Sequence, residues 1–555
     1  MPNIKKTCKI TGKEFEITER EQALYDKLQV PYPEICHEER LRRKVLFRNV
    51  RTLYKRKCSR SGKDIISMYH DKVPFPVYHR DEWWKDDWMP PEQEFDFNRP
   101  FFEQLKELRD QCPRASVFNK KAYGSDYCNV SDGLKDCYLS FVAFESRNLI
   151  YSHRIFGSND LVDCYYCTNA QQCYECVYCF DTFKLIHCVE CRNCTDSAFL
   201  YDCIGCKNCF MCTNLRQKQY YIFNKQHTKE EYEAKMKEVN FGSYMTIQFL
   251  AKKFEDFREA NAIYRSNKND QCEQVEGHRL FNCKNCVDCF EVEEGRDDFN
   301  CIEANGIKDC IDSVSFGKIH TMSELGYEVQ ESCDFYNFKF CNFCYSKSNL
   351  EYCEECHNCE NCFGCIGIKN ESFRIFNKKF YKEEEYHAMK AKIIEYMKQT
   401  GEYGSFFPPE HSPFAYNETE ALEYFPAEKE EVERMGFRWK DDMPSAEGML
   451  VDSMEIPDNI KDIQMDICQK VMQCEITGKK FAITEQELLF YKNNNLPLPR
   501  RCPNQRHSER LKERHVLHLY DRQCTKCGID IKSAYPVNDT YKRVYCDKCY
   551  FESVY

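Results

Sequence analysis

The chain has 555 residues, 39 of which are cysteine, and carries a net charge of −11 at neutral pH. This length exceeds what a single hydrophobic core fills, so several folded units are expected. The composition is 42% hydrophobic and 30% charged, which excludes a disordered chain and a membrane protein. The acidic balance argues against a general binder of polyanions.

The sequence has neither the apolar run of a secretory signal at its start nor an apolar stretch of about 18 residues anywhere. We therefore expect a cytoplasmic protein with no membrane contact. Thiols stay reduced in that compartment, so the cysteines have to be explained by metal binding, by packing or by redox chemistry.

The two ends of the chain repeat each other at a constant offset of 466 residues. TCKITGKEFEIT at 7–18 corresponds to QCEITGKKFAIT at 473–484. A repeat of this kind predicts one module that is present twice, over residues 1–95 and 466–555.

Both modules contain incomplete sets of candidate metal ligands. A complete site would carry four soft ligands. The second half of the N-terminal module has one cysteine and one histidine, and the first half of each module has two cysteines. The candidates for weak metal binding are Cys58, His79, Cys474 and Cys502.

A densely basic segment runs from Arg40 to Lys63, with Phe47 and Tyr54 interleaved. It predicts either an electropositive face for nucleic acid or an acidic protein surface, or an ordinary solvated helix face. The candidate contact residues are Arg40, Arg42, Arg43, Lys44, Arg48, Arg51, Lys55 and Arg56.

Cysteines recur every 15 residues within 96–225, as in the column formed by Cys164, Cys179, Cys194 and Cys209. A column of small or apolar residues at a fixed period is typical of a solenoid, in which each coil stacks the same side chain on the coil below. The pattern predicts a short parallel β-solenoid of 15-residue coils, preceded by a capping helix at 100–111.

A helical connector is expected over 226–267, and a second copy of the ladder follows it. NCFMCTNLRQKQYYIFNK at 208–225 corresponds to NCFGCIGIKNESFRIFNK at 361–378. We expect a second β-solenoid with an exit helix over 268–400, with a slip of one residue between 310 and 329.

Three roles are open for the ladder cysteines. They can pack as small buried side chains, bracket soft metals such as Zn²⁺ or Cu⁺, or act as redox sensors. Serine, alanine and leucine occupy the same columns, which favours packing.

Residues 401–465 form an aromatic and proline-rich connector, in which GSFFPPEHSPFAYNETEALEYFP at 404–426 is the most specific stretch. It is either a binding or catalytic loop or an ordered clamp that packs the second solenoid against the C-terminal module. The candidate loop residues are His411, Tyr416, Asn417 and Glu418.

The second half of the C-terminal module carries two C-x-x-C motifs. Two such turns supply four soft thiolates, which suits tetrahedral Zn²⁺ and leaves no open catalytic position. We therefore predict a structural zinc site formed by Cys524, Cys527, Cys546 and Cys549.

The repeated motif C-x-x-[C/T]-G-K-x-F, followed by P-x-x-C, resembles the zinc-ribbon (treble-clef-like) domain of bacterial proteins. The whole layout is similar to an uncharacterised family of cysteine-rich proteins in small-genome bacteria. The resemblance implies small α+β modules on both sides of the solenoids, and it supplies no activity.

Together these features predict a mainly β protein that binds zinc and acts as a scaffold or binding protein, contacting nucleic acid or a protein partner through its terminal modules. Alternatives are a soft-metal or thiol reservoir or redox sensor, and a solenoid enzyme with its site near 404–426. The sequence has no nucleotide-binding glycine loop, nucleophile elbow or HExxH motif, so a non-enzymatic role is favoured.

Overall fold

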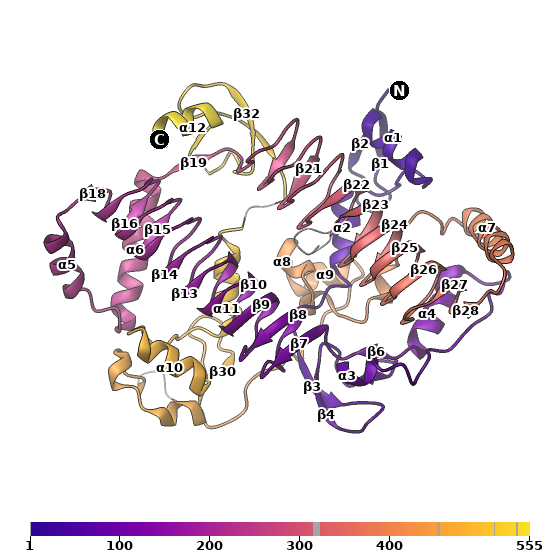
Figure 1. Ribbon diagram of the computed structural model, residues 1–555, viewed down its shortest axis with the longest axis horizontal. Coiled ribbons are helices and arrows are strands. Elements are labelled where there is room, and N and C mark those ends of the chain that lie inside the picture. The colour runs from indigo at the N-terminus through magenta and orange to yellow at the C-terminus, as the bar shows by residue number, and fades with distance from the viewer. Residues whose placement is uncertain (1, 315–321, 452–454, 515–516, 540–541) are drawn as a thin grey trace. The chain divides into compact units, whose positions relative to one another are not determined.

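The computed structural model describes residues 2–314, 322–451, 455–514, 517–539 and 542–555 (Figure 1). The chain divides into two compact units, each assembled from separate stretches of sequence. Unit 1 comprises Met1–Ser116, Asn267–Asp441 and Leu517–Leu519, and unit 2 comprises Val117–Ser266, Asp442–Val516 and Tyr520–Tyr555. The N-terminal module therefore belongs with the second ladder of strands, and the C-terminal module with the first.

Unit 2 contains a twelve-stranded sheet built from the first ladder. All its strand pairs are parallel except the last, β17 with β18. The strands are β7 (Asn119–Tyr123), β8 (Asn129–Lys135), β9 (Phe141–Ile150), β10 (His153–Phe156), β11 (Asn159–Val162), β12 (Tyr165–Thr168), β13 (Gln171–Tyr174), β14 (Phe183–Ile186), β15 (Thr195–Tyr201), β16 (Lys207–Thr213), β17 (Gln219–Ile222) and β18 (Lys225–Gln226).

The coil of this ladder has twelve residues, so the predicted coil of fifteen is wrong. His153 pairs with Tyr165, twelve positions further along, and the neighbouring pairs keep the same interval. Every third residue has a positive φ, as at Asn169 (51°) and Gln172 (53°), so the chain turns there and four short sides complete one coil. Fifteen is a multiple of three, and cysteines on every third position therefore recur at fifteen without marking the coil length.

The ladder interior is filled by the residue that follows each turn. Cys176 is completely buried, and its thiol donates to the carbonyl of Tyr174 over 3.5 Å. Ser158 does the same toward Phe156 at 2.9 Å and also accepts the N–H of Ala170, one coil on, at 3.0 Å. The inward position therefore favours a short side chain that both donates and accepts, which explains why cysteine and serine share the columns.

The second ladder lies in unit 1 and follows the same rule. Cys333 pairs with Tyr345 twelve positions on, whereas Ile307 pairs with Ser323, sixteen positions on. The register therefore shifts by four residues here instead of the predicted one, and part of that segment, 315–321, lies outside the described residues. The strands are β20 (Glu276–His278), β21 (Val287–Phe290), β22 (Ile307–Ile311), β23 (Ser323–Gln330), β24 (Cys333–Asn342), β25 (Tyr345–Glu351), β26 (His357–Phe363), β27 (Ser372–Ile375) and β28 (Lys378–Lys379).

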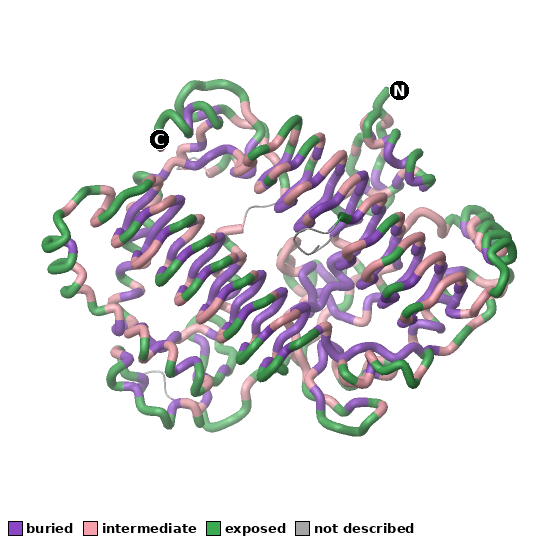
Figure 2. Tube along the Cα trace, in the orientation of Figure 1, coloured by how far each residue is buried: buried purple, intermediate pink, exposed green. Residues whose placement is uncertain are grey.

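Each ladder closes with an antiparallel hairpin and a helix. The pair β17 and β18 leads into α5 (Lys229–Glu238), and the pair β27 and β28 leads into α7 (Glu383–Thr400). An open strand edge invites pairing with other chains, and these hairpins and helices end the two ladders. Figure 2 shows buried residues recurring along every coil of both ladders.

Two further helices cover ladder faces. In unit 2, α6 (Tyr244–Asn261) places Phe254 5.9 Å from the ring of Phe199. In unit 1, α4 (Phe101–Gln111) is the helix that was expected to cap the first solenoid. That expectation is wrong, because Phe101 packs on the second ladder, with ring centroids 5.2 Å from Tyr352 and 5.3 Å from Phe376.

Short helices fill the connectors, and no helix among the described residues is long and apolar enough to cross a membrane. In unit 1 the connector elements are η1 (Pro409–His411), η2 (Tyr416–Glu418), α8 (Ala421–Tyr424) and α9 (Lys429–Arg434). In unit 2 they are β19 (Ile263–Arg265), η4 (Ile460–Asp462) and η5 (Met465–Gln469).

Candidate metal centre

The terminal modules are built from small antiparallel hairpins, each followed by helix. The N-terminal module contains β1 (Ile4–Thr7), β2 (Glu14–Ile17), α1 (Glu19–Leu28), α2 (His37–Val45), β3 (Tyr54–Lys57), β4 (Asp64–Ser67), β5 (Val77–Tyr78) and α3 (Arg80–Trp83). Beyond the module, β6 (Arg114–Ala115) pairs in parallel with β5. The C-terminal module contains β29 (Val471–Gln473), β30 (Lys480–Ala482), α10 (Glu485–Asn493), α11 (Pro503–Leu511), β31 (Tyr520–Gln523), β32 (Asp530–Ser533), β33 (Arg543–Tyr545) and α12 (Asp547–Val554).

Four of these hairpins share one turn, in which a cysteine accepts the N–H of a glycine four residues later at 2.9 Å. Each glycine has a φ between 68° and 75°, a conformation that glycine adopts without strain. We name the turns and the residue that completes each of them knuckle 1 (Cys8–Gly12 with Cys36), knuckle 2 (Cys58–Gly62 with His79), knuckle 3 (Cys474–Gly478 with Cys502) and knuckle 4 (Cys524–Gly528 with Cys546).

The completing residue is a helix N-cap in every knuckle: α2, α3, α11 and α12 begin directly after it. The residue after the first cysteine also donates its N–H to a carbonyl two positions before this cap, at 2.8 to 3.1 Å in all four copies. The backbone of the knuckle is thus held by hydrogen bonds of its own, whether or not its side chains are metal ligands.

Knuckle 4 alone carries four cysteines. The sulfur atoms of Cys524, Cys527, Cys546 and Cys549 all lie within 4.8 Å of one another. The Cys527 and Cys546 sulfurs are 3.9 Å apart. A tetrahedral zinc ion with Zn–S bonds of about 2.3 Å places its sulfurs about 3.8 Å apart, so this group fits such an ion.

The electrostatics of knuckle 4 favour a bound cation. Although burial raises it, hydrogen bonds from the N–H groups of Cys546 and Cys527 hold the pKa of Cys524 at about 6. Burial and the neighbouring thiols Cys527 and Cys546 raise the pKa of Cys549 to about 12. Ionising all four thiols together therefore requires positive charge between them.

Helix α12 connects knuckle 4 to the first ladder. β33 pairs in parallel with β19, and Arg265 on β19 holds Asp547 at 2.8 Å. The hydroxyl of Tyr550 contacts both the Asp202 carboxylate and the Arg216 guanidinium on the ladder. A metal that fixes the start of α12 would therefore also fix how this helix sits on the ladder.

The other knuckles do not gather three metal-binding atoms among the residues that the structure describes. In knuckle 2, the His79 ring accepts the N–H of Asp81 at 3.3 Å and so caps α3, while Cys58 accepts the N–H of His79 at 3.2 Å. In knuckle 3, Cys502 faces the hydroxyl of Thr477 at 3.7 Å.

The basic segment does not form an exposed face at three of its predicted positions. Arg40, Lys44 and Arg48 are at most 5% exposed. Arg48 is paired with Glu303, Glu331 and Glu420 of unit 1. The sequence revealed the density of positive charge but not the carboxylates that neutralise it, which lie hundreds of residues away.

The remaining basic residues lie nearer the surface. Arg42 contacts Glu39 and stacks over the Phe425 ring, Arg51 lies 3.8 Å from Glu423, and Arg56 donates to the carbonyl of His70. Arg43 is half-buried and Lys55 is exposed.

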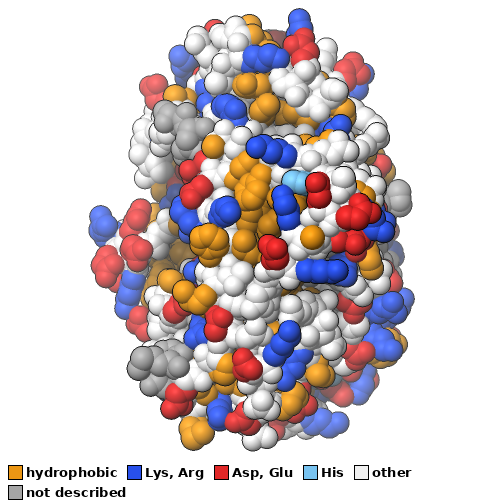
Figure 3. Space-filling view, turned by 90° about the vertical axis from the view of Figure 1, so that its left-hand side faces the viewer, with side chains coloured by type: hydrophobic (Ala, Val, Ile, Leu, Met, Phe, Trp, Pro, Cys, Tyr) orange, Lys and Arg blue, Asp and Glu red, His pale blue; other side chains and the backbone are white. Residues whose placement is uncertain are grey.

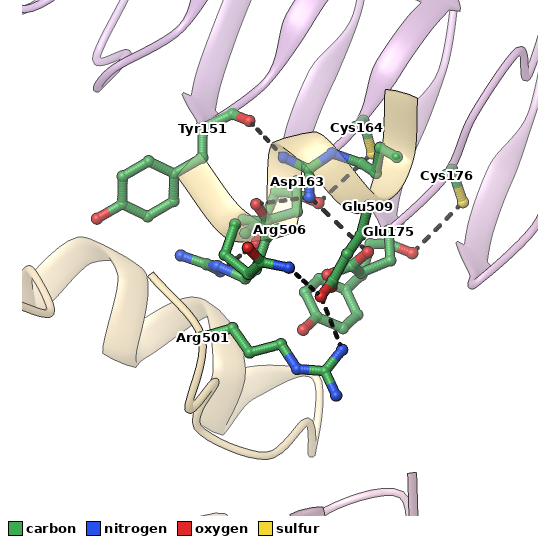
Figure 4. Close-up of polar contacts among 12 residues, drawn as sticks. Tyr151, Asp163, Cys164, Glu175, Cys176, Arg501, Arg506 and Glu509 are labelled. Carbon is green, nitrogen blue, oxygen red and sulfur yellow. Dashed lines mark hydrogen bonds and ion pairs between the residues drawn. The ribbon is translucent and has the colours of Figure 1, made fainter. Parts of the chain in front are cut away.

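Sequence reasoning missed a buried ionic cluster where α11 meets the first ladder (Figure 4). Asp163 pairs with Arg506 and, at 2.9 Å, with Arg510. Arg506 also approaches Glu487, which accepts the hydroxyl of Tyr151 at 3.0 Å. Burial raises the pKa of Glu487 to about 7, against the influence of Arg506.

Unit 1 repeats this cluster at equivalent positions. Arg40, which corresponds to Arg506 at the offset of 466, pairs with Asp312 at 2.7 Å. Arg40 also lies 3.8 Å from Glu328, the counterpart of Glu175 in the first ladder. The pKa of the buried Asp312 is held well below its usual range by Arg40 and Lys44, which outweigh burial. Each module therefore meets its ladder through the same arginine–aspartate contact.

The candidate side chains of the 404–426 loop form hydrogen bonds to the backbone of the loop and of the residues that follow it. Tyr416 donates to the carbonyl of Phe425 at 2.8 Å, Asn417 donates to the carbonyl of Lys440 at 2.7 Å, and Glu418 accepts the N–H of Ala415 at 2.7 Å. Burial, with Arg109 nearby, lowers the pKa of His411 to about 3.

Within unit 1 the loop packs against the N-terminal module. The Ser412 hydroxyl donates to the carbonyl of Leu46 at 2.7 Å, and the N–H of Glu420 donates to the carbonyl of Arg48 at 3.0 Å.

Comparisons with known proteins add no family. No protein family matches the chain, and no curated protein matches it. One solved structure, described as "putative acetyltransferase from Desulfovibrio desulfuricans G20", is similar at 12% identity over 46% of this chain and 64% of that chain, with a TM-score of 0.10. The fold and the site define a cysteine-rich, strand-rich protein with a Cys₄ group that could hold a metal ion.

Proposed function

We propose that this protein is a zinc-stabilised scaffold, in which two β-solenoids of twelve-residue coils carry small zinc-ribbon-like modules. The observation that carries the proposal is knuckle 4, whose four sulfurs lie within 4.8 Å of one another. Four thiolates complete a tetrahedral shell and leave no position for a substrate, so the metal has a structural role.

The zinc would join the hairpin of β31 and β32 to the start of α12. When bound, it supplies four bonds that lock this junction. The chain then uses α12 for docking, through Asp547 on Arg265 and Tyr550 on Asp202. Loss of zinc is expected to loosen α12 before it affects the coils.

A protein partner suits the surface better than nucleic acid does. The net charge is −11, and the most buried arginines of the basic segment are neutralised within unit 1. Meanwhile α6 leaves Met245 and Phe249 68% and 65% exposed, one helical turn apart, which is unusual for large apolar side chains without a partner. Figure 3 shows hydrophobic side chains gathered on one face of the molecule, among charged side chains of both signs.

The cysteine content supports a reducing, cytoplasmic compartment and membership of the cysteine-rich family of small-genome bacteria. All 39 cysteines are free thiols. A chain that relied on an oxidising compartment would be expected to pair many of them.

Metal analysis of the purified, reduced protein tests the proposal. We expect about one zinc per chain by elemental analysis, since only one complete Cys₄ group is present among the described residues. Cys549→Ser should lose this zinc, whereas Cys58→Ser, in a knuckle with a single cysteine, should retain it.

Other results would favour the alternatives. Several soft metals per chain would support a thiol reservoir, although no ladder cysteine belongs to a group of three metal-binding atoms within the described residues. Co-purifying nucleic acid that is lost on charge reversal of Arg43 and Lys55 would replace the protein partner. An activity that His411→Ala abolishes in a folded protein would support an enzyme.

A further inference from the structure

Knuckles 1 and 3 each bring together two cysteines instead of four. Cys8 lies beside Cys36 in knuckle 1, and Cys474 beside Cys502 in knuckle 3, because the N–H after the first cysteine donates to the carbonyl two residues before the second at 3.1 Å. The same backbone bond is present in knuckle 4, where the sulfurs of Cys524 and Cys546 lie within 4.8 Å of each other. Threonine stands where the second ligand of a metal site would be, as Thr477 does 3.7 Å from Cys502. Two modules thus retain the same dithiol independently of each other.

The two thiols of a pair differ in their surroundings. Although burial raises it, hydrogen bonds from the Thr11 hydroxyl and from backbone N–H groups lower the pKa of Cys8 to about 6. The same kind of donors lowers the pKa of Cys474 to about 7, again against burial. Burial raises the pKa of the partner thiols Cys36 and Cys502. Each pair therefore has one thiol that ionises readily and one that stays protonated beside it.

The four thiols of these pairs are buried, with exposed fractions of 2–5%, but they differ from most ladder cysteines in where they are buried. Residues 9–12 of knuckle 1 and 475–478 of knuckle 3 are exposed, so each dithiol lies just beneath a surface turn. A ladder cysteine such as Cys176 is completely buried, with its S–H donated to a carbonyl.

We propose that knuckles 1 and 3 are reversible dithiol–disulfide sites whose oxidant is a hydroperoxide. The thiolate of Cys8 attacks a peroxide oxygen, which breaks the O–O bond, gives a sulfenic acid and, with hydrogen peroxide, releases water after protonation. The sulfur of Cys36 then attacks the sulfenic sulfur, and a second water leaves as the disulfide forms. Two thiols lose two electrons and two protons, and the peroxide is reduced to two waters.

Mass spectrometry on the full-length, zinc-loaded protein tests this proposal without any substitution. The folded protein is exposed to hydrogen peroxide, remaining thiols are blocked with N-ethylmaleimide, and the digest is searched for disulfide-linked peptides. We expect links between Cys8 and Cys36 and between Cys474 and Cys502, both reversed by dithiothreitol. Cys58 is the matched control, because it occupies the same turn with no second thiol and should form no intramolecular link.

Substitution then separates the two roles. In Cys36→Ser, the sulfenic acid of Cys8 should persist long enough for trapping by dimedone, while the link in knuckle 3 still forms. Zinc content should be unchanged by mild oxidation, which separates this proposal from the one for knuckle 4. If the wild-type protein oxidises its ladder cysteines first, or if Cys8 and Cys474 remain free after the other accessible thiols have reacted, the proposal is overturned.

Discussion

At the scale of single residues, the interior of a ladder admits few side chains. Cysteine, serine and leucine recur there, but one inward position of the second ladder holds a carboxylic acid, Asp298, which is completely buried. Cys310 donates its N–H to Asp298 at 2.9 Å, and the Cys286 thiol lies 3.7 Å from the same carboxyl group. Gly295 makes room for it, because a Cβ there would come within 2.9 Å of the acid.

Burial, reinforced by Cys301 and Cys286, raises the pKa of Asp298 well above its usual range. Because its pKa is higher in the folded than in the unfolded chain, Asp298 contributes its full stability only below the unfolded pKa of about 3.9. This contribution decreases as the pH rises toward the pKa of the folded state. Asp298→Asn, which keeps the shape but not the charge, should therefore raise the free energy of unfolding by about 1–3 kcal/mol at pH 7. The gain should vanish near pH 3.5.

Thermal or denaturant unfolding across this pH range measures the effect. Asp288→Asn, at an exposed turn of the same ladder, is the control and should change little. A gain for Asp298→Asn that is independent of pH would contradict a buried, protonated acid.

At the scale of elements, the knuckles show that the backbone fold of a metal-binding turn is present even where cysteine ligands are missing. All four retain the glycine turn and the helix cap, and these depend on backbone hydrogen bonds, whereas three have lost one or more cysteines. Knuckle 4 alone has four cysteines, and the helix that follows it, α12, docks through Tyr550, which reaches Asp202 and Arg216 on the ladder.

Tyr550→Phe removes only the hydroxyl from this contact. Because Asp202 and Arg216 then lose a buried partner, we expect the free energy of unfolding to fall by about 1–3 kcal/mol. Amide hydrogen exchange in α12 should accelerate while zinc content stays the same. Tyr381→Phe is a suitable control, because that side chain is 90% exposed. Loss of zinc in Tyr550→Phe would mean that docking and metal binding cannot be separated.

At the scale of the molecule, each terminal module is joined to the ladder that is more distant in sequence. The N-terminal module shares unit 1 with the second ladder, and the C-terminal module shares unit 2 with the first. The contact is the same in both units, an arginine on a module helix against a ladder aspartate. Neither half of the sequence therefore contains a complete unit.

Removing either arginine should open the corresponding unit. Arg506→Ala leaves Asp163 and Glu487 buried with reduced compensation, and we expect a loss of about 3–5 kcal/mol in the free energy of unfolding. Arg40→Ala should behave alike in unit 1.

A double-mutant cycle identifies the cause. Asp163→Asn should recover part of the loss in Arg506→Ala, because the unpaired charge is then gone. Arg43→Ala, on the same helix as Arg40 but with no carboxylate partner among the described residues, should be nearly neutral. A pair of losses that simply add would show that the two residues do not interact.

The sequence predicted the internal repeats, the inward packing of the ladder cysteines and the convergence of the four cysteines in knuckle 4. It could not give the coil length, because every multiple of three keeps the same side chains pointing inward. Only the strand pairing, such as that of His153 with Tyr165, distinguishes twelve from fifteen. Nor could it give the ion-pair partner of Arg40. That partner, Asp312, lies far along the sequence, and the first ladder stands between the two residues in the chain.

The turn at every third residue decides which changes of length the ladders can absorb during evolution. Deleting one triplet keeps all inward side chains inward but rotates every later side by a quarter of a coil. The aspartate that meets a module helix would then point elsewhere. Deleting twelve residues shortens the rod and returns each side to its original direction. Insertions and deletions that survive selection in such a chain should therefore cluster at multiples of twelve, and those of three or six should coincide with a new surface for the module.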